Sequence, residues 1–307
     1  MRAALLHLDD ALIRQQALVA QVTALGGRAV DLRDLGPALR LWSRAPALED
    51  LRARLAEALP PSGGPTLVFS GSGDFHHVTP LLLERAIEAA GRPAVTVVHF
   101  DNHPDWVRFA NGVHCGSWVG RAARMEQVAR VITVGVCSQD IRRPNPRRAD
   151  LDLLAEGRLE LYPYRAPDGA ACAELGGRQW PTIEAMGEAE FATFLPGRIQ
   201  TEAIYITIDK DVLRPKDAAT NWDQGRTSLA YLRRLLVGLL RNHRLIGADV
   251  LGDWSPAIYG GGALSCVLKQ GEALLDQPWS RPPQAARAAG EAVNLNLLDL
   301  IADGASG

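Results

Sequence analysis

The sequence lacks several features that would place it in a common class of protein. Its formal net charge is −2 and it has no basic stripe with interleaved aromatic residues, so nothing favours binding to nucleic acid or to an anionic membrane. No stretch approaches the ~18 to 20 uninterrupted apolar residues of a membrane helix. Residues 1–30 lack the layout of a signal peptide, and the four cysteines form no Cys-x-x-Cys pair. These absences predict a soluble cytoplasmic protein with reduced thiols.

What the sequence does contain is an alternation of apolar strands and helical patterns along most of its 307 residues. Strands are predicted at 3–8, 28–32, 66–69, 94–100, 131–136, 203–208 and 245–251. Helices are predicted at 11–25, 48–59, 81–90, 228–241 and 263–275. This alternation indicates an α/β fold with a parallel sheet covered on both faces.

Residues 138–200 follow no such pattern. The segment is rich in Gly and Pro, and it predicts loop and irregular structure around one strand at 159–162. Four arginines lie between residues 142 and 148. We interpret them as a solvated surface loop rather than as an anion site.

The most informative segment is His-Phe-Asp-Asn-His-Pro-Asp at 99–105, at the end of the predicted strand 94–100. Asp101, His103 and Asp105 alternate, so in an extended backbone they project to one side. The carboxyl end of a parallel strand is where α/β sheets bind ligands. Ionisable groups after a buried strand are costly unless a metal neutralises them. The pattern therefore favours a metal site over a polar turn with a capping Asp.

Two further segments repeat this arrangement. Asp209 and Asp211 follow the apolar strand 203–208, and a glycine-rich turn after the strand 66–69 leads to His76 and His77. With one of these two histidines, the three segments supply two imidazoles and four carboxylates. Such a set suits two divalent cations bridged by carboxylates, about 3.5–4 Å apart. Its many oxygens favour Mn²⁺ over Zn²⁺.

His114 lies in a glycine-containing loop shortly after the Asp-rich segment. A histidine there is able to act as a proton shuttle. A solvated loop histidine is an equally good interpretation of this segment alone, and both stay open.

In order and spacing, these segments resemble the motifs of the ureohydrolase family, which includes arginases, agmatinases and formimidoylglutamases. The family's Gly-Gly-Asp-His-Ser, Asp-Ala-His-x-Asp and Ser-x-Asp-x-Asp-x-x-Asp-Pro motifs are similar to residues 73–76, 101–105 and 207–215. The resemblance implies one arginase-like metallohydrolase domain over residues 1–307. Its fold would be a three-layer α/β/α arrangement with a mostly parallel sheet, of the arginase-deacetylase type.

The resemblance also implies roles for individual residues. The metal ligands would be His76, Asp101, His103, Asp105, Asp209 and Asp211. Asp101 and Asp209 would bridge two metal ions, which would activate a water for attack on the carbon of a small guanidino or amidino compound. Asp105 would accept the proton of that water, and His114 would protonate the leaving amine. By the same analogy, the protein would be a homo-oligomer.

Four features depart from the family's motifs, among them Arg214 in place of an acidic residue and the absence of a Pro-Gly-rich loop at 218–225; the other two bear on the site. Phe75 inserts a residue before the histidine of the first motif, which leaves His76 and His77 as alternatives, with His76 preferred. The carboxylate expected to hold a guanidinium falls on Gly252, unless a one-residue bulge brings in Asp253. The departures predict an intact metal site beside a reshaped substrate pocket.

Three hypotheses follow. The first is a binuclear, manganese-type hydrolase of a linear C–N bond. The second is a deacetylase-like amidohydrolase with one metal held by Asp101, His103 and Asp209. The third is a catalytically silent, metal-binding protein. Six candidate ligands favour the first hypothesis over the second, because one ion does not require six.

Overall fold

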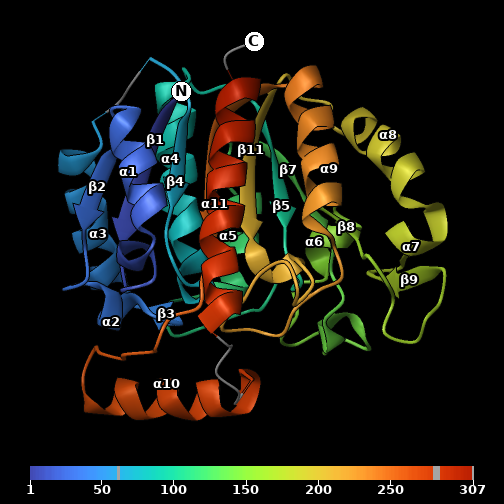
Figure 1. Cartoon of the computed structure of the whole chain (residues 1–307). Helices are drawn as coiled ribbons and strands as arrows, with labels where there is room; N and C mark the ends of the chain where they lie inside the picture. The colour runs from blue at the N-terminus through green and yellow to red at the C-terminus, as the bar shows by residue number, and fades with distance from the viewer. Residues whose placement is uncertain (61–62, 279–283, 306–307) are drawn as a thin grey trace.

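In the computed structural model, which describes residues 1–60, 63–278 and 284–305, eight strands form one sheet (Figure 1). Their spatial order is β2 (Arg28–Asp31), β1 (Arg2–His7), β4 (Thr66–Phe69), β12 (Arg244–Leu251), β11 (Ala203–Asp209), β5 (Val95–Phe100), β7 (Val128–Val134) and β8 (Leu159–Tyr162). Each strand is parallel to its neighbours. Every residue of the central strands β5 and β11 is buried, which explains their near-continuous apolar sequences.

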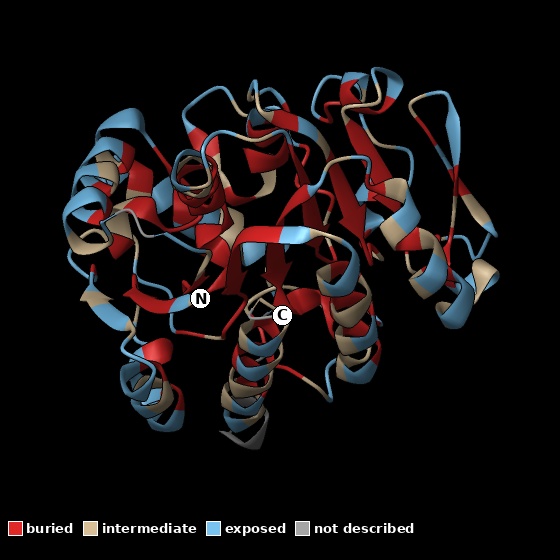
Figure 2. Ribbon diagram, turned by 90° about the horizontal axis from the view of Figure 1, so that it is seen from above, coloured by how far each residue is buried: buried red, intermediate tan, exposed pale blue. Residues whose placement is uncertain are grey.

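Helices cover both faces of the sheet. One layer consists of α1 (Gln16–Ala24), α8 (Glu188–Arg198), α9 (Leu229–Asn242) and α11 (Gln284–Gly304). The opposite layer consists of α3 (Ala45–Ala58), α4 (Thr79–Ala89), α5 (Trp118–Ala123) and α6 (Asp152–Ala155). Each layer forms its own apolar core with the sheet, and Figure 2 shows buried strands between helices whose outer faces are exposed. The predicted three-layer α/β/α fold is confirmed.

Smaller elements complete the chain. They are the helices α2 (Gly36–Leu39) and α7 (Ile183–Met186), and the two-stranded pairs β3 (Trp42–Ser43) with β6 (Val113–His114) and β9 (Cys172–Leu175) with β10 (Arg178–Pro181). Residues 138–200 are therefore more regular than predicted. Their apolar spacing is weak, and Pro196 lies inside α8, which obscures the helix in the sequence. The sequence also did not predict α11, where the fully buried Asn294 interrupts the apolar face.

The helix α10 (Ala263–Asp276) stands apart from the two layers (Figure 1). The Lys269 ammonium donates a hydrogen bond of 2.8 Å to the Ala38 carbonyl and so ties α10 to the region of α2. Much of its apolar side remains open, with Leu275 85% exposed. Among the described residues, no helix is both long and apolar enough to cross a membrane.

Candidate metal centre

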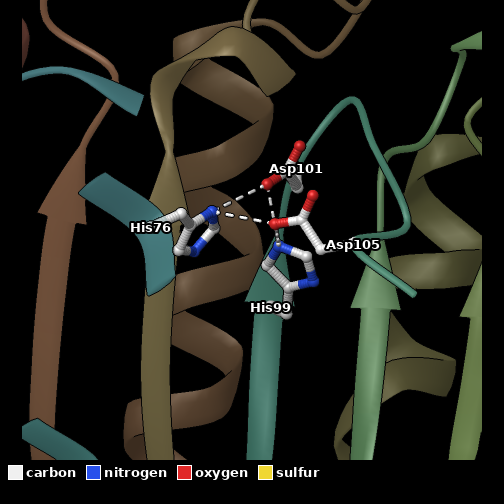
Figure 3. A group of neighbouring side chains, drawn as sticks. All are labelled: His76, His99, Asp101 and Asp105. Carbon is white, nitrogen blue, oxygen red and sulfur yellow. Dashed lines mark hydrogen bonds and ion pairs between the residues drawn. The ribbon is translucent and has the colours of Figure 1, made fainter. Parts of the chain in front are cut away.

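The six predicted metal ligands meet at the carboxyl edge of the sheet. β5 and β11 are direct neighbours, so the segments that follow them lie side by side. The turn after β4 forms the 3-10 helix η2 (Gly73–Val78), and the Ser72 hydroxyl caps it by accepting a hydrogen bond from the Asp74 amide. This helix brings His76 over the ends of β5 and β11, where it points toward Asp101 and Asp105 (Figure 3).

The first group of donors surrounds His76. Its Nδ1 lies 3.1 Å from Asp101 Oδ2, 3.1 Å from Asp105 Oδ2 and 3.8 Å from Asp209 Oδ2. His99 joins this group, because its Nε2 lies 2.8 Å from Asp101 Oδ2. All five side chains are buried. The donor atoms of His76, His99, Asp101 and Asp105 are close enough to hold one metal ion.

The second group consists of Asp101, His103 and Asp211. His103 Nδ1 lies 2.9 Å from Asp211 Oδ2 and 3.4 Å from Asp101 Oδ1. Asp101 thus belongs to both groups, with one oxygen directed to each. Two donor groups that share a carboxylate are what a pair of bridged cations requires.

Hydrogen bonds fix the orientation of two of the imidazoles. His76 Nε2 lies 3.0 Å from Thr207 Oγ1, whose hydroxyl lies 3.2 Å from Asp249 Oδ2. His103 Nε2 lies 2.8 Å from Asp223 Oδ1. In both rings Nε2 is suited to donate to these oxygens, so Nδ1 faces the carboxylates and is the nitrogen available to a metal ion. Such partners orient the histidines of metal sites.

The charges in the centre favour bound cations. Burial and the nearby charge of Asp101 raise the pKa of Asp209 to about 7. Burial acts to lower the pKa of His76, but its contacts with Asp101 and Asp105 outweigh this and hold the pKa well above its usual value. Protein groups alone therefore leave buried carboxylates that repel one another and attract positive charge. The donor set fits divalent cations.

Of the two adjacent histidines, the structure places only His76 among these carboxylates. His77 is also buried but faces a separate cavity of about 110 Å³ beside α3. The residue inserted at Phe75 is accommodated within η2, and its ring is 1% exposed.

The sequence prediction did not include His99 or Asp223. The alternation that groups Asp101, His103 and Asp105 extends back one step to His99, so a signal for it was present. Asp223 lies in a loop far along the chain, and only its contact with His103 in the folded chain identifies it.

The structure does not bring Asp253, the predicted substrate-binding residue, to the metal centre. Its carboxylate is 4% exposed and accepts hydrogen bonds from Lys210 Nζ at 2.5 Å, Gln15 Nε2 at 2.8 Å and Asn294 Nδ2 at 3.0 Å. Both carboxylate oxygens are engaged in a buried ion pair, so we do not assign Asp253 to substrate binding.

Gly252 has no room for the carboxylate side chain that the family's motif would place there. Its φ is 91°, and a Cβ would lie 2.3 Å from Asp209 Oδ1 and 2.5 Å from the Lys210 amide nitrogen. We expect Gly252→Ala to displace Asp209 and to weaken metal binding, in addition to a loss of about 1–3 kcal/mol from backbone strain and crowding. Metal titration and urea unfolding measure the two effects.

Gly187→Ala is the matched control for this prediction. Gly187 has a φ of 94° with nothing within 4 Å of the added Cβ, so it reports the backbone strain without the collision. Metal affinity equal to that of the unsubstituted protein in Gly252→Ala would contradict the expected displacement of Asp209.

The six predicted ligands line a cavity of about 600 Å³, whereas His99 is fully buried behind them. Aromatic residues line its wall, namely Trp106, Phe109 and Trp222. His114 lines the same cavity; its Nδ1 accepts a hydrogen bond of 2.8 Å from the Gly116 amide, and its Nε2 contacts the Glu272 carboxylate of α10. The cavity is large enough for a small molecule beside the donor groups.

Comparisons with known proteins support the fold. No protein-family profile matches the chain. A protein of unassigned function from Thermotoga maritima is 29% identical over 191 residues, which are 62% of this chain and 59% of that protein, less than two thirds of its length. The structure is similar to arginase from Bacillus cereus, with a TM-score of 0.61 and 12% identity over 96% of this chain and 97% of that chain. It is also similar to a hypothetical agmatinase from Burkholderia thailandensis, with a TM-score of 0.58 and 17% identity over 99% of this chain and 86% of that chain.

At these identities the structural likeness establishes the fold. The resemblance seen in the sequence motifs is confirmed at that level: the chain has the fold of the ureohydrolase family of arginases and agmatinases.

Proposed function

We propose that the protein is a metal-dependent hydrolase that cleaves a linear C–N bond in a small guanidino or amidino compound. The observation that carries this proposal is the pair of donor groups that share Asp101 at the floor of a cavity. Their place at the carboxyl edge of an arginase-type sheet supports a ureohydrolase-like reaction.

Two divalent cations, of the Mn²⁺ type, would be held by His76, Asp101, His103, Asp105, Asp209 and Asp211. His99 is an additional donor in the first group. When bound, such cations supply Lewis-acid activation of water. The six predicted ligands comprise four carboxylates and two imidazoles, which favours Mn²⁺ over Zn²⁺.

Asp105 is placed to accept the proton of the attacking water. The Trp118 indole N–H donates a hydrogen bond of 2.6 Å to Asp105 Oδ2, and the Val119 amide donates to the Asp105 carbonyl at 3.3 Å. These contacts hold Asp105 in a left-handed backbone conformation with φ of 49°, an uncommon conformation for this residue type that tends to occur at functional sites.

His114 is placed to protonate the leaving amine. Its Nδ1 accepts a backbone hydrogen bond, so the ring proton sits on Nε2, next to Glu272 and facing the cavity. Water would add its oxygen to the guanidino or amidino carbon and give a proton to Asp105. The C–N bond would break, and the departing nitrogen would take a proton from Nε2 as Nε2 regains the proton released by the water, so that His114 acts as a proton shuttle.

His114→Asn is expected to lower kcat by about 100- to 1,000-fold, because it removes the proton donor to the leaving amine. The metal content should stay unchanged, since His114 belongs to neither donor group. Steady-state kinetics and elemental analysis measure both quantities. An unchanged kcat in the His114 variant would exclude this role.

The test of the proposed function is a screen of guanidines and amidines with the Mn²⁺-loaded protein, in which product amine is measured and Asp101→Asn serves as the blank. Turnover that depends on Asp101 supports the proposal. Metal binding without turnover of any compound would instead support a catalytically silent protein. One metal ion per chain together with hydrolysis of acylated amines would support the deacetylase-like alternative.

We further infer a cytoplasmic homo-oligomer. The exposed apolar side chains of α10, Leu264, Leu274 and Leu275, support self-association, and the described cysteines form no disulfide. Light scattering coupled to gel filtration tests the oligomeric state, and a monomer at micromolar concentration would contradict it.

A further inference from the structure

We propose that the cavity also binds a carboxylate of its substrate, through Arg142, Arg143 and Arg148. This inference rests on the proposed function and narrows it: the substrate would be a guanidino or amidino carboxylic acid, with a cationic group at one end and an anionic group at the other.

The three arginines line the cavity that contains the metal donor groups. The sequence predicted a solvated surface loop for them, and their side chains are exposed, yet they lie at the mouth of this cavity. They follow the 3-10 helix η4 (Gln139–Ile141), and their loop returns to the site at Ala149. Exposure at the mouth of a cavity leaves them accessible to a ligand.

Backbone contacts fix the end of this loop beside the metal ligands. Ala149 forms an antiparallel bridge with Val107, which comes two residues after the proposed ligand Asp105. The Asp150 amide donates a hydrogen bond of 2.8 Å to the Trp106 carbonyl. The backbone at Arg148 is therefore held beside the segment that carries Asp105.

The charges of these arginines have no ion-pair partner in the part of the chain that the structure describes. Among the ion pairs of the described residues, none includes Arg142, Arg143 or Arg148, whereas nearby Arg108 Nη2 lies 3.0 Å from Asp150 Oδ1. Arginine binds carboxylates with paired N–H donors, so three unpaired guanidinium groups at a cavity mouth suit an anionic ligand group.

Carboxylates lie elsewhere in the same cavity. Glu272 and Asp276, one turn apart on α10, line it together with the carboxylates of the metal centre, and Asp140 lies on the arginine side. With cations bound, the carboxylates of the metal centre are neutralised, so a guanidinium or amidinium group is favoured beside Glu272 and Asp276 of α10, and a carboxylate beside the arginines. A compound with a cationic group at both ends would place one of them against like charge.

The test compares three probes that share one guanidinium and a four-carbon chain: 4-guanidinobutyrate, butylguanidine and 4-aminobutylguanidine. Calorimetry measures their binding to the Mn²⁺-loaded protein, and turnover is measured separately. We expect the carboxylate probe to bind about 10-fold more tightly than the neutral one, and the diamine-derived probe to bind most weakly. The preference should fall as NaCl is raised, because the arginines are exposed.

Arg148→Gln and the double variant Arg142→Gln/Arg143→Gln should reduce the preference for the carboxylate probe several-fold, through KM rather than kcat. Arg147→Gln is the matched control, because Arg147 lies on the same loop but does not line the cavity. A preference that survives in both Arg148→Gln and Arg142→Gln/Arg143→Gln would overturn the proposal, as would equal binding of the three probes or binding of none.

The outcomes separate this inference from the proposed function. Turnover without a carboxylate preference would support the hydrolase and exclude the carboxylate site at the arginines. An arginine-dependent preference in binding, without turnover of any probe, would support the carboxylate site and count against the hydrolase.

Discussion

Asp253→Ala is expected to destabilise the protein by about 3–5 kcal/mol, because it leaves Lys210 as a buried cation without a counter-ion. Lys210 is fully buried, and its Nζ contacts Asp253 Oδ1 at 2.5 Å and Asn294 Oδ1 at 2.8 Å. Burial already lowers the pKa of Lys210. Urea unfolding monitored by circular dichroism measures the loss.

The loss of folding stability in the Asp253→Ala variant should grow as the pH falls. Between its lowered folded-state pKa and its unfolded-state pKa, a buried lysine binds fewer protons in the folded state than in the unfolded state, so stability rises with pH across that window and is constant below it. The double variant Lys210→Met/Asp253→Leu should recover much of the stability, since it buries apolar groups in place of the ion pair. If Asp253→Ala were instead as stable as the unsubstituted protein but had lost substrate affinity, Asp253 would be assigned to substrate binding.

Asp101→Asn is expected to weaken the binding of both metal ions at least about 100-fold and to abolish measurable turnover. The reason is that Asp101 directs one oxygen to each donor group, whereas Asp211 belongs only to the second. Elemental analysis after gel filtration of the Mn²⁺-loaded protein measures the effect. Asp211→Asn should weaken the binding of mainly one ion, the one held by the second group.

Asp276→Asn is the control for charge, because Asp276 lines the cavity but belongs to neither donor group. Its metal content should match that of the unsubstituted protein. Two tightly bound ions in Asp101→Asn would contradict the assignment of Asp101 as the shared ligand.

The parts of the fold and site that the sequence predicted are those with a local pattern. Apolar runs marked the strands of the sheet, and carboxylates at alternate positions after β5 and β11 marked the segments that meet in space. The carboxyl ends of neighbouring parallel strands share one edge, so this meeting follows from the fold.

The parts that the sequence did not predict depend on contacts between distant segments. Glu272 reaches His114 from a helix that stands apart from the sheet, and Asp223 reaches His103 from a loop. The structure holds Asp253 in a buried ion pair with Lys210 instead of bringing it to the cavity, and the sequence does not show that Lys210 turns inward. A fully buried lysine is rare, and only its partner explains it.

Anomalous diffraction from crystals of the Mn²⁺-loaded protein is the decisive test of whether two metal ions share Asp101. Two peaks are expected, one beside His76 and Asp105 and one beside His103 and Asp211, with Asp101 between them. A single peak would favour the one-metal alternative. No peak at the carboxyl edge of the sheet would exclude a metal centre there.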